Sequence, residues 1–325
     1  MQTESLKKMK TVSIVMCTYN GEQYLREQMD SLLAQTYPIR EIIVQDDVST
    51  DSTWKILTDY ATKHPDVVKA TQNKERKGYR LNFMSALLKA TGDYVAISDQ
   101  DDIWLPEKIE VLVKEIGDAA LVFHDSILFS TSANDMGRLH RQGMPTHMHP
   151  IATLLKPQGY GHQLMFRKDL LERLVLFANH PLSYDYFIQM LAGTMIGGVK
   201  YVDKVLVRWR RFEGATTFHG FNREKGSKIQ GYIDAFKAFS DKKRKHTVKA
   251  YFALCLQVSF CDEEACRIAH WMSQANGWSV LKASAMCLKH RHELCPDAHG
   301  TIQIIRALFM PLAFFRDYAG YILED

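Results

Sequence analysis

The chain has 325 residues, of which 46% are hydrophobic and 24% are charged, and its formal net charge at pH 7 is +4. These values are typical of a soluble globular protein, and so small a charge gives no reason to expect a nucleic acid as partner. No apolar stretch reaches the roughly 18–20 residues of a membrane-spanning helix. The N-terminal segment has no apolar signal core and the six cysteines form no CxxC pair, so we expect reduced thiols in a cytoplasmic protein.

Strands and helices are predicted to alternate over the first hundred residues. Apolar, β-branched runs predict strands at 12–17, 41–45, 67–71 and 93–98, and apolar residues at helical spacing predict helices at about 25–33, 53–60 and 81–90. Such alternation predicts βαβ units and a mainly parallel sheet, with all strand carboxyl ends along one edge because crossovers are right-handed.

The alternation weakens after residue 119. We expect a strand at 119–129, a loop at 131–150, a strand and short helix within 164–177, a helix at 183–191 and a strand at 198–208. From about 222 onward the chain is predicted to be mostly helical. This gives a catalytic domain at 1–218, with halves at about 11–130 and 131–218, and a helical region at 219–325.

Polar clusters follow three of the predicted strands. They are Thr18-Tyr19-Asn20, Asp46-Asp47 and the run from Asp99 to Asp102. In open α/β sheets, ligands bind outside the carboxyl ends of the strands. An Asp-x-Asp pair in such a turn suits a hard divalent cation that shares phosphate oxygens, so Asp99 and Asp101 predict Mg²⁺ or Mn²⁺ on a diphosphate. Asp102 could instead cap the following helix.

The sequence contains neither of two other common nucleotide-binding motifs. No GxGxxG follows the first strand, which argues against a dinucleotide site, and no GxxxxGK[ST] occurs, which argues against a P-loop.

The first third of the chain resembles the family 2 inverting glycosyltransferases, which have a GT-A fold. The resemblance rests on SIVMCTYNGEQYL, QTYPIREIIVQDDVSTDST and GDYVAISDQDDIWLPEKIE, in this order within residues 11–110, and it extends more loosely to about 215. The motif SDQDDIWLPEK is similar to that of the bacterial rhamnosyltransferase branch, which builds surface polysaccharides.

The resemblance implies roles for individual residues. Thr18, Tyr19, Asn20 and Glu22 would line the nucleotide pocket, Asp46 would bind the base or ribose, and Asn73, Lys77 and Gly78 would form a loop near the donor. Asp99 and Asp101 would form the Asp-x-Asp, Asp101 being the preferred metal ligand, and Asp102 would adjoin the sugar or metal. Gly161, His162 and Gln163 would shape the donor-sugar and acceptor pocket together with Trp104, Arg210 and Arg211. The alternative role of His162 is that of a packed polar residue.

Inverting transfer needs a carboxylate that deprotonates the acceptor hydroxyl. In the family this base lies downstream, ahead of aromatic residues in a helix, so SYDYFIQMLAG nominates Asp185. The alternative role of Asp185 is a first-turn acid stabilised by the helix dipole.

The chain departs from the family pattern at three positions. Trp209 replaces a tyrosine and Phe212 a histidine around Arg210, and Val48 stands where glycine is common after the Asp pair. The missing histidine weakens the link to the rhamnosyltransferases.

The last predicted helix, within 301–323, has apolar residues at helical spacing. It could pack on the catalytic domain or on a partner in a homodimer, or it could touch a membrane surface, which would suit a lipid-linked acceptor.

The prediction from the sequence is therefore an inverting glycosyltransferase of bacterial surface polysaccharide synthesis. It would use a nucleotide-sugar donor (dTDP-rhamnose or a UDP-sugar), a divalent cation and a saccharide or lipid-linked acceptor. Two alternatives are a sugar-nucleotide pyrophosphorylase, for which TYNGEQYL is too acidic and too poor in glycine, and a non-catalytic nucleotide- or carbohydrate-binding protein.

Overall fold

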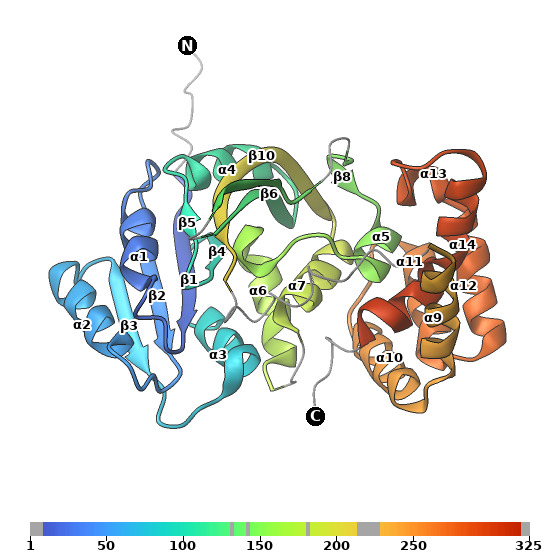
Figure 1. Ribbon diagram of the computed structural model, residues 1–325, viewed down its shortest axis with the longest axis horizontal. Helices are drawn as coiled ribbons and strands as arrows, with labels where there is room; N and C mark the ends of the chain where they lie inside the picture. The colour runs from blue at the N-terminus through green and yellow to red at the C-terminus, as the bar shows by residue number, and fades with distance from the viewer. Residues whose placement is uncertain (1–8, 131–132, 141–143, 180–182, 213–227, 320–325) are drawn as a thin grey trace, which may run out of the picture.

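The structure is a computed structural model, and it describes residues 9–130, 133–140, 144–179, 183–212 and 228–319. Strands and helices alternate in the first half, and helices alone follow β10 (Figure 1). Their bounds are β1 Val12–Thr18, α1 Leu25–Leu33, β2 Glu41–Asp46, α2 Thr53–Lys63, β3 Val68–Gln72, α3 Gly78–Leu87, β4 Tyr94–Ser98, β5 Ile103–Trp104, α4 Lys108–Ile116, β6 Leu121–Ser130, β7 Ala133–Arg138, β8 His147–Met148, α5 Pro150–Leu155, η1 Gly161–Gln163, β9 Leu164–Arg167, α6 Lys168–Leu174, η2 Val175–Phe177, α7 Tyr184–Gly193, β10 Val199–Arg210, α9 Lys228–Ser240, α10 Lys242–Cys255, α11 Glu263–Gln274, α12 Gly277–Lys289, α13 Arg291–Leu294 and α14 Gly300–Asp317.

The described strands form one mixed, mostly parallel sheet in the order β3-β2-β1-β4-β9-β6-β10-β5, with β7 on β6 and β8 on β10. The parallel pairs β1–β2, β1–β4, β2–β3 and β6–β10 confirm the predicted parallel core. Four of the described strands pair antiparallel with their neighbours: β9 lies between β4 and β6, β7 pairs with β6, and β5 and β8 pair with β10.

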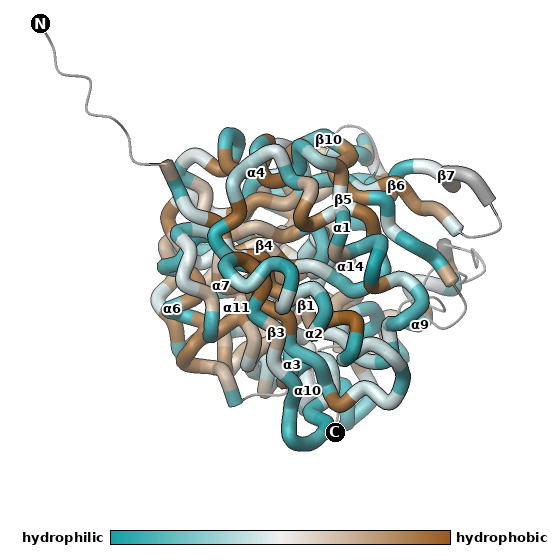
Figure 2. Tube along the Cα trace, turned by 90° about the vertical axis from the view of Figure 1, so that its left-hand side faces the viewer, coloured by the Kyte–Doolittle hydropathy of each residue, from teal (hydrophilic) through white to brown (hydrophobic). Residues whose placement is uncertain are grey.

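The strand β1 is buried on both faces, which explains its continuous apolar sequence. Ile14 and Met16 pack in one cluster with residues of α1 and α2, whereas Val15 and Cys17 pack in the other cluster with residues of α3. Side chains alternate between the two faces of a strand, so one sequence run serves both layers. Figure 2 shows the same division, with hydrophobic stretches through the interior strands and hydrophilic stretches on many outer segments.

The segment 131–150, predicted as a loop, contains the strands β7 and β8 in its described part, so that prediction was wrong there. Both are short and pair with strands distant in sequence, β6 and β10, so no local pattern marks them. The predicted domain boundary near 215–222 lies outside the described residues.

The helices from α9 to α14 confirm the helical character predicted for the last third (Figure 1). In α14, Phe314 and Phe315 are buried in the cluster that also contains Val15 of the sheet, while Ile302 and Ile304 are exposed. This part of α14 therefore packs against the rest of the chain. Among the described helices, none is both long enough and apolar enough to cross a membrane.

Candidate active site

The predicted polar clusters meet at the carboxyl edge of the sheet. Thr18 and Asp46 end the neighbouring strands β1 and β2, and the Thr18 hydroxyl donates to Asp46 Oδ1 at 2.8 Å. The other Asp46 oxygen accepts from the backbone N–H of Ser49 at 3.0 Å and from Gln72 Nε2 at 2.9 Å. Asp46 is fully buried, so in this structure it holds together the ends of three strands.

Asp47 organises the loop in which Asn73, Lys77 and Gly78 lie. Its carboxylate accepts hydrogen bonds from Asn73 Nδ2 and from the backbone N–H groups of Lys77 and Gly78, each at 2.8 Å. Gly78 has φ 77°, a conformation that favours glycine. The three residues predicted from the resemblance are thus gathered around a carboxylate of the Asp46-Asp47 cluster to which the resemblance assigned no role.

Tyr19, Asn20 and Glu22 connect this edge to its neighbours. The Tyr19 backbone exchanges two hydrogen bonds with the side chain of Gln100 in the acidic turn. Asn20 Oδ1 accepts from the backbone N–H of Thr50, and the Glu22 carboxylate accepts from that of Ser52. The Arg76 guanidinium lies 3.9 Å from the centre of the Tyr19 ring, so an aromatic and a cationic surface stand together here.

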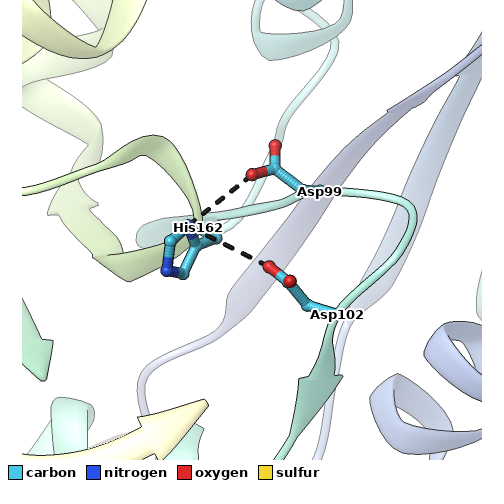
Figure 3. Close-up of side chains that lie close together, drawn as sticks. All are labelled: Asp99, Asp102 and His162. Atoms are coloured by element: carbon cyan, nitrogen blue, oxygen red, sulfur yellow. Dashed lines mark ion pairs between the residues drawn. The ribbon is translucent and has the colours of Figure 1, made fainter. Parts of the chain in front are cut away.

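Two acids of the turn converge on a histidine from a distant segment (Figure 3). His162 Nδ1 lies 3.6 Å from Asp99 Oδ2 and 4.0 Å from Asp102 Oδ2, and one ligand atom from each of the three residues lies within 4.8 Å of the others. His162 Nδ1 and Asp102 Oδ2 are buried without a hydrogen-bond partner. Two carboxylates and an imidazole in this arrangement form a donor set that suits a divalent cation.

Contacts of the second ring nitrogen, Nε2, fix the orientation of the His162 ring. Its Nε2 lies 3.0 Å from the Ser126 hydroxyl, which also accepts from Gln163 Nε2 at 3.1 Å. Gln163 Oε1 in turn accepts from the Tyr160 backbone N–H at 2.9 Å. Histidines that bind a metal through one ring nitrogen typically have the other nitrogen hydrogen-bonded in this way.

The acidic turn carries strong electrostatic strain. Burial and then the charge of Asp99 raise the pKa of Asp101 to about 7. Burial, followed by the charges of Asp101 and Asp99, raises the pKa of Asp102 well above its ordinary value. Burial also lowers the pKa of His162. Without a bound cation, these groups therefore favour their neutral forms.

Positive side chains partly offset the acids. The Arg210 backbone N–H donates to Asp102 Oδ1 at 3.1 Å, its Nε donates to the Asp101 carbonyl at 2.9 Å, and its guanidinium pairs with Glu27. Arg211 is also buried, with its guanidinium 4.8 Å from the Trp209 ring. Arg210 therefore lies beside the acidic turn, as the resemblance implied, although its neighbour Trp209 replaces a tyrosine.

Lys108 was missed by the sequence analysis as a site residue. It is fully buried, donates to the His162 carbonyl at 2.7 Å, and lies 3.2 Å from the ring centre of Trp104. Trp104 is buried too, and β5 pairs it with Val207 of β10. The signal was present, since Lys108 closes the motif SDQDDIWLPEK.

Asp185 lies in the first turn of α7. Its Oδ1 accepts from the Ser183 hydroxyl at 2.6 Å and from the Tyr186 backbone N–H at 2.9 Å. Burial is the largest cause that raises its pKa, and the negative charge of Asp99 contributes. The two carboxyl groups are therefore within electrostatic range of each other.

Gly161 permits a close approach between η1 and α7. A Cβ atom at Gly161 would lie 2.4 Å from the Tyr184 hydroxyl oxygen, so no larger residue fits without a shift. This contact places the segment of His162 directly against the start of the helix that carries Asp185.

A family model for glycosyl transferase family 2 matches residues 13–175, just over half of the chain. The putative glycosyltransferase EpsE of Bacillus subtilis is 41% identical over 99 residues, covering 30% of this chain and 36% of EpsE. The dTDP-rhamnosyl transferase RfbG of Shigella flexneri is 31% identical over 121 residues, covering 36% and 40% of the two chains. The matched region thus spans between about a third and two fifths of these relatives.

Solved structures extend the likeness of fold to nearly the whole chain. S. aureus TarS 1–349 in complex with UDP-GlcNAc has a TM-score of 0.54 at 18% identity, covering 95% of this chain and 90% of that one. The mannosyltransferase PcManGT from Pyrobaculum calidifontis, in complex with GDP-Man and Mn²⁺, has a TM-score of 0.52 at 19% identity, covering 94% and 86%.

Proposed function

Because this chain belongs to the family 2 glycosyltransferases, we propose that it transfers a sugar, with inversion, from a nucleotide-diphosphate sugar to a saccharide acceptor with the help of a divalent cation. The observation that carries the proposal is the cluster of Asp99, Asp102 and His162, in which two buried ligand atoms have no hydrogen-bond partner. Buried polar atoms without partners are costly, and a bound cation would satisfy them.

Asp99, Asp102 and His162 would hold Mg²⁺ or Mn²⁺ in this proposal. Asp101, nominated from the Asp-x-Asp pattern, would add negative charge beside them. When bound, the cation would neutralise charge on the diphosphate of the donor. Arg210 and Arg211 would supply further positive charge for the same group.

The nucleotide would lie along the edge formed by Thr18, Tyr19, Asn20 and Glu22, with the loop of Asn73, Lys77 and Gly78 opposite. The Tyr19 ring beside Arg76 offers a surface on which a base can stack. Asp47 would keep the loop in place through its three hydrogen bonds.

Asp185 would act as the general base. Its carboxylate would accept the proton of the acceptor hydroxyl while the hydroxyl oxygen attacks the anomeric carbon and the nucleotide diphosphate leaves on the opposite face. A raised pKa makes Asp185 a stronger base than an exposed aspartate. Gly161, His162, Gln163 and Trp104 would shape the space for the donor sugar.

We further propose dTDP-rhamnose or a UDP-sugar as donor and a bacterial surface polysaccharide as product. The names of the similar proteins support this, since one is a dTDP-rhamnosyl transferase and another was solved with UDP-GlcNAc. The enzyme would act in the cytoplasm, with a catalytic domain at 1–218 and contact to the inner membrane face through the region 219–325.

Binding of UDP, dTDP and GDP, each with and without Mn²⁺, tests the proposal in a thermal-shift experiment. Ligands that bind only the folded protein raise its melting temperature by mass action. We expect one of the three to do so, only with Mn²⁺, and to lose the effect in Asp99→Asn and in His162→Phe. A nucleotide sugar that carries the stabilising nucleotide should then release its nucleotide diphosphate when an acceptor is present. Failure of all three nucleotides to stabilise the protein would contradict the proposal.

A further inference from the structure

The helix α9 carries a row of exposed apolar side chains. It lies with α14 at the end of the molecule opposite α2 and β3 (Figure 1). Ile229, Ile233 and Phe236 of α9 are 71%, 43% and 53% exposed. Residues three or four positions apart share one face of a helix, so these side chains lie in one row along α9.

The row continues onto α14. The Phe236 ring meets the Phe309 ring of α14 edge to face, with centroids 5.5 Å apart. Ile302 and Ile305 precede Phe309 at helical spacing on the same face of α14, and Ile302 is exposed. We call this surface the apolar strip; it comprises Ile229, Ile233, Phe236, Ile302, Ile305 and Phe309. A contiguous apolar surface of this kind marks an interaction site.

Positive charge is concentrated beside the apolar strip. The segment 228–250, which contains α9 and the first half of α10, has seven lysines and arginines but only two aspartates, so its formal net charge is +5. The whole chain has +4, and the remainder of the chain therefore has −1. Lys237 is exposed one turn after Ile233, and Lys245 Nζ lies 4.2 Å from the ring centre of Phe239.

A cavity of about 450 Å³ opens at Lys237, next to the strip. Its charged lining residues are Asp234, Lys237, Asp241, Arg244 and Arg316. Both carboxylates already accept hydrogen bonds within the protein, since Asp234 accepts from a glutamine one turn earlier and Asp241 accepts from the Arg244 backbone N–H at 2.7 Å. The three cations outnumber these two acids, so the cavity favours an anionic group.

The basic run after α9 is not explained by helix stability. The first turn of α10 contains Lys242, Lys243 and Arg244 and no acid. Positive charge at this end of a helix opposes the helix dipole. A negatively charged partner outside the chain gives these side chains a role, and lysines beside exposed apolar residues are typical of segments that bind anionic membrane surfaces.

We propose that the apolar strip and the cations beside it dock the protein on a bilayer that contains anionic phospholipids. The strip would enter the headgroup region, and lipid phosphates would lie against Lys237 and the cavity of Arg244 and Arg316. This inference deepens the membrane contact of the proposed function and rests on it. It assigns that contact to α9 and the exposed side of α14.

Cosedimentation with vesicles tests the inference, without nucleotide and without Mn²⁺. One set of vesicles is phosphatidylcholine alone, and in the other about a third of the lipid is phosphatidylglycerol. We expect binding to the second set only, and its loss at high salt because salt screens the attraction.

The lysines are tested by a triple substitution, Lys237→Gln with Lys242→Gln and Lys243→Gln, which should weaken vesicle binding at least about tenfold. The matched control replaces three exposed lysines of α2 and β3 by glutamine and changes the net charge equally; these are Lys55, Lys63 and Lys69. The control should bind the vesicles like the unsubstituted protein. Equal weakening by the two triple substitutions would show a general charge effect and overturn the inference.

The apolar strip is tested by Ile229→Ser with Ile233→Ser, which should weaken vesicle binding at least about fivefold. Leu176→Ser with Ile196→Ser is the matched control, because these two side chains are 70% and 83% exposed outside the C-terminal helices. Its vesicle binding should be unchanged. All of these positions are exposed, so the melting temperature of each variant should stay close to that of the unsubstituted protein.

Other occupants of the surface give different results. If the protein leaves both sets of vesicles unbound, and light scattering shows a dimer that Ile229→Ser with Ile233→Ser separates, the strip binds a second copy and the inference is wrong. Stabilisation by inorganic phosphate without any vesicle binding would assign the cavity to a free anion and also overturn it. Sugar transfer is judged separately, since nucleotide binding should be unchanged in all of these variants.

Discussion

The Asp185 carboxylate has two competing roles, a general base or a charge that favours the N-terminus of α7. If it is the base, Asp185→Asn should lower sugar transfer by at least about a hundredfold, because an amide cannot accept the proton. Nucleotide binding, measured by thermal shift, should persist. Glu263→Gln is the control, since Glu263 also lies in the first turn of a helix, α11, yet is exposed. Full transfer activity in Asp185→Asn would leave only the helix-stabilising role.

The acids of the turn predict how the stability of the cation-free protein depends on pH. The pKa of Asp101 is raised to about 7 and that of Asp102 is raised as well, so the folded protein holds protons that the unfolded chain releases near pH 4. This stabilising contribution is fully present below about pH 4 and is lost as the pH rises through 7, with a slope of up to about 1.4 kcal/mol per pH unit for each group.

Urea unfolding at pH 5, 6, 7 and 8 measures this loss. Mn²⁺ should offset it, so its stabilising effect should be larger at pH 8 than at pH 5, because a cation binds the ionised carboxylates. Asp101→Asn should flatten the profile in the absence of the cation. The same pH profile in the unsubstituted protein and in Asp101→Asn, both without cation, would show that Asp101 is not strained.

At the same scale, the sequence located the acidic turn but not its full set of partners. Asp99 and Asp101 were expected to act together from their spacing, whereas the structure brings Asp99 and Asp102 to His162. The spacing rule assumes alternate residues on one side, but the turn after β4 leads within a few residues into β5, and the histidine comes from η1, 60 positions along the chain. Such a contact depends on the tertiary arrangement of β4, β6 and β9.

At the scale of elements, the connection between β2 and α2 contains a strained residue. Val48 has φ 62°, where a β-branched side chain clashes with the backbone. Val48→Gly should therefore raise the free energy of unfolding by about 1 kcal/mol, measured by urea unfolding.

The matched control is Val175→Gly. The Val175 side chain is 51% exposed, and its φ of −53° is ordinary for a helix. Glycine there should lower stability by about 0.5–1 kcal/mol through the entropy of the unfolded chain. Equal effects of the two substitutions would mean that the turn carries no strain.

The elements that could be predicted are those with a continuous local signal. The strands β1, β2 and β4 are buried runs of apolar residues, and α1 and α7 have apolar residues at helical spacing, so each was located within a few residues. The two-residue strands β5 and β8 exist because β10 pairs with them. Nothing in so short a segment marks it as a strand before its partner is in place.

At the scale of the whole molecule, one hydrophobic cluster joins the sheet to the last helix. It contains Val15 of β1, Phe187 of α7, Tyr251 of α10 and Phe315 of α14, all of them buried. The rings of Phe187 and Tyr251 lie 6.4 Å apart, which carries the contact from α7 to the C-terminal helices. A shared core of this kind favours unfolding as a single unit rather than as two independent domains.

Phe315→Ala tests this coupling from the end of the chain farthest in sequence from the nucleotide edge. Removing the fully buried ring should cost about 3–5 kcal/mol, a fall of roughly 10 °C in the melting temperature of a chain this size. Ile302→Ala, on the same helix but 52% exposed, should cost much less. The stabilising nucleotide with Mn²⁺ should shift the same single calorimetric transition upward in both variants, because the sheet and the helices share it. If two transitions appear, one lowered by Phe315→Ala and the other raised by the nucleotide, the C-terminal helices form a separate folding unit that does not depend on the sheet.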